Sequence, residues 1–254
     1  MIARGIIRRG GLTMNTIKFN AGNTKVIAHR GLSGIEKENT NAAFIAAGNR
    51  SYYGIETDIR RTSDGRFVVN HDKNLLRVAG EDILVEETPL DVLESIVLFD
   101  KDGSKSRADL RPCSLENYIS ICKKYEKRCV LELKSEFTDE ETARFVGIIK
   151  ELGYLEYVTF ISFIYENLVK IRKIVPSQSV QFLFSEYSDA IAKRVIADRF
   201  DVDAYVGTLS GEIIKKFHEA GLVVNVWTVD DKDTAEQLVA MGVDFITTNI
   251  LEGM

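Results

Sequence analysis

The sequence lacks several features that would place it in a specialised class of protein. It has three cysteines, at positions 113, 122 and 129, and three prolines. An odd number of cysteines without a CxxC pair argues against a disulfide framework or a structural zinc site, and favours reduced thiols in a cytoplasmic protein. No apolar run reaches the ~18 residues that a membrane-spanning helix needs, so no stable membrane anchor is expected.

The sequence also lacks an excess of positive charge: 33 lysines and arginines stand against 38 acidic residues, and the formal net charge is -5. A protein that binds duplex nucleic acid usually carries a basic stripe, so no nucleic-acid partner is expected. An anionic small molecule is compatible with this charge, since a bound cation can reverse the local field. The chain has 254 residues, 45% of them hydrophobic and 28% charged, which is ordinary for a globular enzyme with a sizeable core.

The amino-terminal segment is basic but has no apolar stretch of the ~7–15 residues that a secretory signal needs. We expect residues 1–23 to form a poorly ordered leader and residues 24–254 to form a single catalytic domain. The sequence makes no prediction about the oligomeric state.

Short β-branched runs alternate with amphipathic stretches along most of the chain, which implies βαβ units and a parallel sheet. Expected strands lie at 24–28, 54–59, 129–133, 158–162, 180–184, 204–206, 223–228 and 245–247. Eight such units favour a closed (β/α)8 TIM barrel, in the α/β class, over a doubly wound open sheet. No GxGxxG or P-loop phosphate fingerprint follows any of these strands.

The alternation breaks after the second strand. The turn at Ser63-Asp64-Gly65 is too short for a crossover helix, so the run that follows it should return antiparallel. Folding about residue 64 pairs position 56 with 72 and position 58 with 70, which places His71 beside Glu56 and Asp58. Residues 73–113 have no clean period, and we expect an insertion over one end of the barrel, either a lid or a solvated excursion.

Three predicted strands end in charged residues, and the carboxyl ends of barrel strands are where TIM-barrel enzymes carry their working residues. These residues are His29 and Arg30, then Glu56 and Asp58, then Glu132 and Lys134. The acids would repel one another inside a barrel unless they surround a cation or pair with Arg30, Arg60 or Lys134. Oxygen ligands favour one divalent cation of the hard type, Mg²⁺ or Ca²⁺.

Two of the three histidines fall beside this acidic cluster. His29 and His71 lie at predicted strand ends, whereas His218 lies on a predicted helix and is interpreted as a surface residue. Two histidines at one site suit general acid–base catalysis, because imidazole has a reference pKa of ~6.5. Arg30 and Lys134 could hold an anionic group there or form salt bridges with the acids.

Five motifs together resemble the glycerophosphodiester phosphodiesterase family: VIAHRG, KENT at 37–40, GIETDIRRTSDGRFVVNHD, LELK and VNVWTVDD. The resemblance runs from about Thr24 to the carboxyl terminus and is least clear over 73–113. It implies a phospholipase-C-like barrel that hydrolyses glycerophosphodiesters, small-molecule substrates, to an alcohol and glycerol 3-phosphate with a divalent cation. The implied roles are metal ligands for Glu56, Asp58 and Glu132, acid–base catalysis for His29 and His71, and phosphate binding for Arg30 and Lys134.

Trp227 and Glu38 are further residues that the resemblance places at the pocket. Trp227 could instead be a core residue, and Glu38 could instead support the helix that follows it. The sequence departs from the family at Lys37, where a proline is usual, and at Asn249, where an aspartate is usual and one charge is therefore lost near the pocket. Alternatives are a lysophospholipase D-like lipid phosphodiesterase and a catalytically silent binding barrel.

Overall fold

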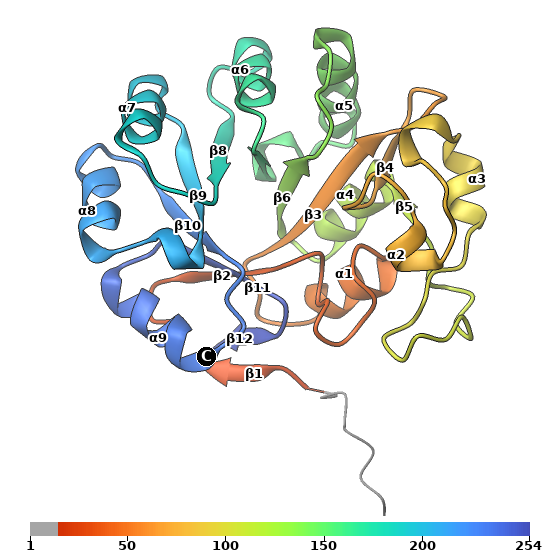
Figure 1. Ribbon diagram of the computed structural model, residues 1–254, viewed down its shortest axis with the longest axis horizontal. Coiled ribbons are helices and arrows are strands. Elements are labelled where there is room, and N and C mark those ends of the chain that lie inside the picture. The colour runs from red at the N-terminus through yellow and green to blue at the C-terminus, as the bar shows by residue number, and fades with distance from the viewer. Residues whose placement is uncertain (1–14) are drawn as a thin grey trace, which may run out of the picture.

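Eight parallel strands close into a barrel in the computed structural model, which describes residues 15–254 (Figure 1). Strand β11 pairs with β2 and β2 pairs with β3, so the sheet closes on itself. The predicted TIM barrel is therefore confirmed. The barrel strands are β2 (Lys25–Ala28), β3 (Gly54–Arg61), β6 (Arg128–Leu133), β7 (Val158–Ser162), β8 (Ser179–Phe184), β9 (Asp201–Tyr205), β10 (Val224–Trp227) and β11 (Phe245–Thr248).

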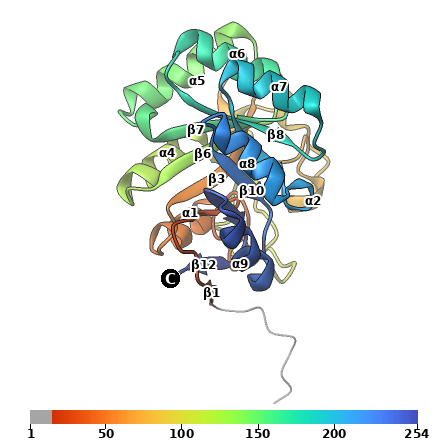
Figure 2. The ribbon, with the colours of Figure 1, turned by 90° about the vertical axis from the view of Figure 1, so that its left-hand side faces the viewer.

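Helices cover the outside of the barrel and pack against the outward-facing strand residues (Figures 1 and 2). Several begin at capping side chains, including Thr40, Ser114 and Thr138, whose capping box with Glu141 is complete. The covering helices are α1 (Asn41–Gly48), α4 (Leu115–Lys124), α5 (Asp139–Glu151), α6 (Tyr165–Ile174), α7 (Asp189–Asp198), α8 (Gly211–Glu219) and α9 (Lys232–Met241), with short 3-10 turns at Leu155–Tyr157 and Val206–Thr208. Within residues 15–254 no helix combines the length and apolarity that crossing a membrane requires.

The interior of the barrel holds a layer of side chains that separates its two ends. Ile27, Val130, Ile161 and Leu183 form an apolar cluster there. Beside it, the Asn225 amide donates a hydrogen bond to Gln181 Oε1 at 3.2 Å, and Thr247 Oγ1 donates to Asn225 Oδ1, also at 3.2 Å. This layer forms the floor of the cavity at the carboxyl ends of the strands.

A hairpin follows β3, as the sequence predicts. Strand β4 (Phe67–Val69) runs antiparallel to β3 and pairs Val69 with Ile59. The Asn70 N–H donates to the Asp58 carbonyl at 3.1 Å, so the predicted register of the hairpin is confirmed. Because side chains alternate along a strand, this register decides which residues of the hairpin approach the barrel interior.

The segment after β4 packs a small core of its own beside the barrel. It contains α2 (Leu76–Ala79), a 3-10 turn at Val85–Glu87 and α3 (Leu90–Ser95), and it ends at β5 (Cys113–Ser114), which pairs antiparallel with β4. Its buried residues, with Val68 of β4, are Leu75, Val78, Ala79, Val85, Leu90, Leu93, Leu98 and Leu110. The expectation of a solvated excursion is therefore wrong for the apolar positions of this segment.

The two ends of the described chain lie side by side. Strand β1 (Ile17–Phe19) pairs in parallel with β12 (Leu251–Gly253), and Lys18 Nζ lies 2.7 Å from Glu252 Oε1. The expected poorly ordered leader is therefore wrong for residues 15–23, while its first 14 residues lie outside the described part. A three-residue strand shows almost no period, and its pairing partner is distant in sequence, so the pattern could not reveal it.

Candidate active site

A cavity of about 140 Å³ opens among the carboxyl ends of the barrel strands. One side of it carries the residues from β2, β3, β6 and the hairpin, namely His29, Arg30, Glu56, His71, Glu132 and Lys134. The other side includes Asp203 of β9 and Trp227 of β10. The structure thus brings together on the charged side residues that the sequence places at four separate points of the chain.

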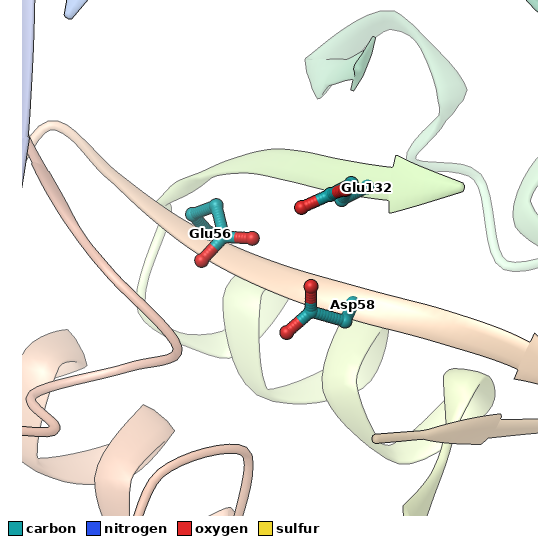
Figure 3. Close-up of side chains that lie close together, drawn as sticks. All are labelled: Glu56, Asp58 and Glu132. Carbon is teal, nitrogen blue, oxygen red and sulfur yellow. The ribbon is translucent and has the colours of Figure 1, made fainter. Parts of the chain in front are cut away.

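Three buried carboxyl groups meet at the base of the charged side. Glu56 and Asp58 share the inward face of β3, and Asp58 pairs in register with Glu132 on β6. One oxygen of each lies within 4.8 Å of the others, and Figure 3 shows the three groups turned toward one another. Among the described residues, Glu56 Oε1 and Asp58 Oδ1 are buried without a hydrogen-bond partner. An acidic oxygen cluster with unpartnered atoms fits a hard divalent cation.

The nearby cations are too few to neutralise these acids. Arg30 Nε lies 3.5 Å from Asp58 Oδ2, and Lys134 Nζ lies 2.8 Å from Glu132 Oε1 and 3.9 Å from Asp58 Oδ1. Arg60, which the sequence also offers as a partner for the acids, instead donates to the His71 carbonyl and pairs with Glu86. Two cations therefore face three acids, and a site for one more positive charge remains.

The excess of negative charge shifts the pKa values of the three carboxyl groups. Burial raises the pKa of Glu56 well above its usual value, and the charges of Asp58 and Glu132 raise it further. Burial and the charge of Asp58 raise the pKa of Glu132 to about 7. For Asp58, burial is outweighed by the charge of Arg30, followed by those of His71 and Lys134, and its pKa is lowered. A bound cation would favour the ionised form of all three groups.

The His-Arg-Gly motif forms a tight turn beside this acidic cluster. Arg30 and Gly31 both have positive φ, +53° and +76°, and a Cβ on Gly31 would lie 2.7 Å from the backbone of Ala43. Only glycine fits such a position without strain and clash. The turn lets the Arg30 N–H donate to Glu56 Oε2 at 2.8 Å, so the motif orients one acid of the cluster.

The Glu-Asn-Thr motif supports the site from the next loop. Asn39, in a left-handed conformation, donates from Nδ2 to Asp58 Oδ2 at 2.8 Å. Glu38 accepts from Arg30 at 2.9 Å and from Arg77 at 2.8 Å. Burial alone would raise the pKa of Glu38, but the hydrogen bonds and charges of these two arginines hold it well below its usual range. Glu38 therefore contacts Arg30, whereas Thr40 caps the following helix.

His29 contacts a neutral amide. Its Nδ1 lies 2.8 Å from Asn249 Oδ1, and the Asn249 Nδ2 and backbone N–H donate to Asp230 at 2.6 and 2.7 Å. Because Asp230 accepts from the amide nitrogen, the amide oxygen faces His29, and His29 Nδ1 carries the proton. His29 Nε2 is left facing Glu56 Oε2 at 3.9 Å. Burial and then the charge of Arg30 lower the pKa of His29.

His71 contacts a carboxylate instead. Its Nδ1 lies 2.7 Å from Asp72 Oδ1, and Arg77 Nε donates to the other oxygen of Asp72 at 2.6 Å. Burial lowers the pKa of His71, with the negative charge of Asp58 opposing this change. A carboxylate partner stabilises the imidazolium form more than an amide does, so the two histidines have different environments.

Trp227 is the last residue of β10, at the carboxyl end of the strand, and lines the cavity. Its Nε1 donates to the Asp203 carbonyl at 3.2 Å, and its ring meets those of Phe163 and Tyr205 edge to face at 5.6 Å each. Sequence reasoning did not assign site positions to Asn39, Asp203 or Asp230. Asn39 lies in the KENT motif, which could have indicated it. Asp203 lies outside the predicted strand 204–206, because β9 begins earlier, at Asp201, and ends at Tyr205, so the predicted bounds were wrong there and hid its inward position.

An eight-stranded barrel with an ionisable cavity at the carboxyl ends of its strands has the architecture of the TIM-barrel enzymes. The chain belongs to the glycerophosphoryl diester phosphodiesterase family, whose family model matches residues 29–252. The predicted family and the assignment as a phosphodiesterase are thereby confirmed.

Individual relatives match along almost their whole length. A glycerophosphodiester phosphodiesterase of Caldanaerobacter subterraneus is 28% identical over 89% of this chain and 94% of its own. The fold is similar to that of an Oleispira antarctica phosphodiesterase solved in complex with the product sn-glycerol-3-phosphate, with a TM-score of 0.79 and 26% identity over 89% of this chain and 92% of that one. A glycerophosphodiester phosphodiesterase structure from Parabacteroides distasonis gives a TM-score of 0.74 and 30% identity over 89% and 93% of the two chains.

Proposed function

We propose that this protein hydrolyses glycerophosphodiesters to an alcohol and glycerol 3-phosphate with one divalent cation, Mg²⁺ or Ca²⁺. The observation that carries the proposal is the buried cluster of Glu56, Asp58 and Glu132, with two unpartnered oxygens, beside two histidines and two cationic side chains. The Oleispira antarctica neighbour was solved with sn-glycerol-3-phosphate as its product, which supports the same product here.

The three acids would hold the cation, and Arg30 and Lys134 would hold the phosphodiester anion. When bound, the cation would supply positive charge that stabilises the charge developing on the phosphate oxygens. Arg30 presents a fork of N–H donors that suits two phosphate oxygens, while Lys134 offers a compact charge. Both side chains already lie at the cavity, so binding requires them to exchange a carboxylate partner for the phosphate.

The two histidine environments support different roles for His29 and His71 in proton transfer. His29, with its proton on Nδ1, has Nε2 free to accept the proton of the attacking hydroxyl, whether water or a neighbouring glycerol hydroxyl. As that oxygen bonds to phosphorus, the phosphorus–oxygen bond to the alcohol breaks. Attack by water gives glycerol 3-phosphate directly, whereas attack by the glycerol hydroxyl gives a cyclic phosphate that water then opens. Asp72 stabilises the imidazolium form of His71 against the opposing effect of burial, and His71 would give its Nε2 proton to the departing alkoxide.

The completeness of the site bears on the alternative of a silent binding barrel. The presence of every acid and both histidines favours catalysis over a silent binding barrel.

The test is release of glycerol 3-phosphate from glycerophosphocholine, measured with a coupled dehydrogenase assay. We expect release that EDTA abolishes and that added Mg²⁺ or Ca²⁺ restores. Glu56→Gln should lose activity, whereas Glu166→Gln, an exposed glutamate paired with Arg194, should not. Undiminished activity after chelation would remove the cation from the proposal, and no release from any glycerophosphodiester would remove the reaction.

A further inference from the structure

Asp203 is a buried carboxyl group without a role in the chemistry described above. It is 1% exposed, and its Oδ1 has no hydrogen-bond partner among residues 15–254. Buried polar groups are nearly always paired, so an unpaired one inside a cavity points to a ligand that pairs with it. Asp203 lines the same cavity as His29 and Glu132.

The topology places Asp203 across the barrel from the acidic cluster. Around the barrel the strand order is β2, β3, β6, β7, β8, β9, β10, β11, so β9 is four strands from β3 in either direction. Alternation along β9 sends Val202 and Ala204 outward into the main core and Asp203 inward. A molecule bound at the acids and reaching across the cavity therefore meets Asp203.

The surroundings of Asp203 suit a neutral hydroxyl group. Its register neighbour Asn225 is already bonded to Gln181 and Thr247, so these side chains leave Asp203 unpaired. Burial and the negative charge of Glu132 raise the pKa of Asp203 well above its usual value. A protonated carboxyl group has one O–H donor and an acceptor oxygen, which is the complement of an alcohol.

Aromatic rings line the cavity near this carboxyl group. Trp227 is fixed by its hydrogen bond to the Asp203 carbonyl, and it contacts Phe163 and Tyr205, which are 43% and 44% exposed. The enclosed side of the cavity can recognise a constant part of the substrate through Asp203. Phe163 also lines the cavity and its ring is exposed, so a variable alcohol can extend past it toward solvent.

We propose that Asp203 is a substrate-binding residue that hydrogen-bonds a hydroxyl of the glycerol group, on the side of the cavity opposite the phosphate. The inference rests on the proposed hydrolysis of glycerophosphodiesters and adds to it the origin of the preference for glycerol. A site built to bond a substrate hydroxyl discriminates strongly against an analogue that lacks it, because its own polar group is then left unpaired.

The experiment compares glycerophosphocholine with ethylphosphocholine, which has the same phosphodiester and choline but no glycerol hydroxyls. We expect Asp203→Ala to lower kcat/KM for glycerophosphocholine roughly 100-fold and to change it little for ethylphosphocholine. Asp203→Asn, which still donates and accepts, should recover much of the loss. The matched control is Asp201→Ala, which removes an inward carboxyl from the same strand but from the cavity at the other end of the barrel.

Binding provides a second measurement that does not depend on turnover. In calorimetric titrations, Asp203→Ala should weaken the binding of glycerol 3-phosphate at least tenfold and leave the affinity for ethyl phosphate unchanged. The melting temperature of Asp203→Asn should stay the same or rise, because no internal hydrogen bond is lost. Equal losses on both substrates and both ligands, or a lower melting temperature with an unchanged glycerol preference, would overturn the proposal. An inactive wild type that still shows the binding difference would instead contradict only the proposed hydrolysis.

Discussion

The two sides of the barrel lumen satisfy their polar groups in opposite ways. On the β3 and β6 side, three carboxyl groups face two cations, and Glu56 and Asp58 keep buried oxygens without partners. On the side of β8, β10 and β11, Gln181, Asn225 and Thr247 bond to one another and are neutral. Carboxyl groups that keep unpartnered oxygens at the cavity, including Asp203 of β9, are therefore completed by ligands, while the neutral Gln181–Asn225–Thr247 network is a structural support.

Loop residues outside the barrel strands hold the charged side in place. Asn39 bonds Asp58, Asn249 bonds His29, and Asp72 bonds His71. Such contacts fix rotamers and tautomers before substrate arrives, which is how a site avoids reorganisation during the reaction. The neutral side needs no such loops, because its partners all lie on barrel strands: Gln181 on β8, Asn225 on β10 and Thr247 on β11.

The largest effects should come from the histidines of the charged side. We expect His29→Ala and His71→Ala each to lower kcat on glycerophosphocholine by ~10²–10⁴-fold. With a p-nitrophenyl phosphodiester, whose leaving group needs no proton, His71→Ala should regain most of its activity and His29→Ala should not. Steady-state kinetics on both substrates measure this difference.

The matched control for both is His218→Ala. His218 also contacts a carboxylate, with Nε2 2.9 Å from Asp244 Oδ2, but it lies on α8 at the surface. Its removal should leave kcat unchanged. If both site variants lost activity equally on the two substrates, the assignment of base and acid would be wrong.

An intermediate effect should appear in the dependence of stability on pH. Because the pKa of Glu132 is raised from 4.5 to about 7 in the folded state, the folded protein holds this proton more tightly than the unfolded chain. The stability that this proton gives is present below the unfolded pKa and is lost as pH rises through the folded value. In EDTA, the melting temperature should therefore fall between pH 5 and pH 8, and added Mg²⁺ or Ca²⁺ should reduce the fall.

Glu132→Gln distinguishes this cause from general effects of pH. The variant carries no charge at this position, so its melting temperature in EDTA should fall less over the same range. It should also gain little from added cation. A decline as steep as that of the wild type would show that Glu132 is not the group responsible, and Glu166→Gln serves as the exposed control.

The smallest effect should come from the neutral side. Asn225→Ala leaves Gln181 and Thr247 without their partner, and we expect the free energy of unfolding to fall by ~1–3 kcal/mol with little change in kcat. Urea denaturation measures the change. Asn49→Ala, which removes an exposed amide bonded to Ile45, should stay within ~0.5 kcal/mol of the wild type. A large loss of kcat in Asn225→Ala would contradict the division between the two sides.

The barrel and its charged side could be predicted from the sequence because both depend on patterns of residues that are close together in the chain. Strands are short runs of fixed alternation, and polar residues at their carboxyl ends must converge once the sheet closes. The turn at Ser63–Gly65 fixed the hairpin register, and that register placed His71 at the cavity. These inferences needed only neighbours in sequence and the rule that parallel strands share one end.

The remaining features depend on contacts between distant loops, for which no local pattern exists. Replacement of the usual aspartate by Asn249 suggested the loss of a charge, yet Asp230 supplies a carboxylate one hydrogen bond further from His29. Likewise, the pairing of β1 with β12 joins segments more than 200 residues apart. Such partners are set by the final packing of the chain.

Trp227 is the sole tryptophan of the chain, and it lines the cavity on the same side as Asp203. Its indole is fixed by the Asp203 carbonyl and borders the space where substrate would lie. Excitation at the indole band therefore reports on this cavity alone, without a background from other tryptophans. The protein carries its own optical probe, so ligand binding and its timing can be followed in the unlabelled wild type by fluorescence titration and stopped flow.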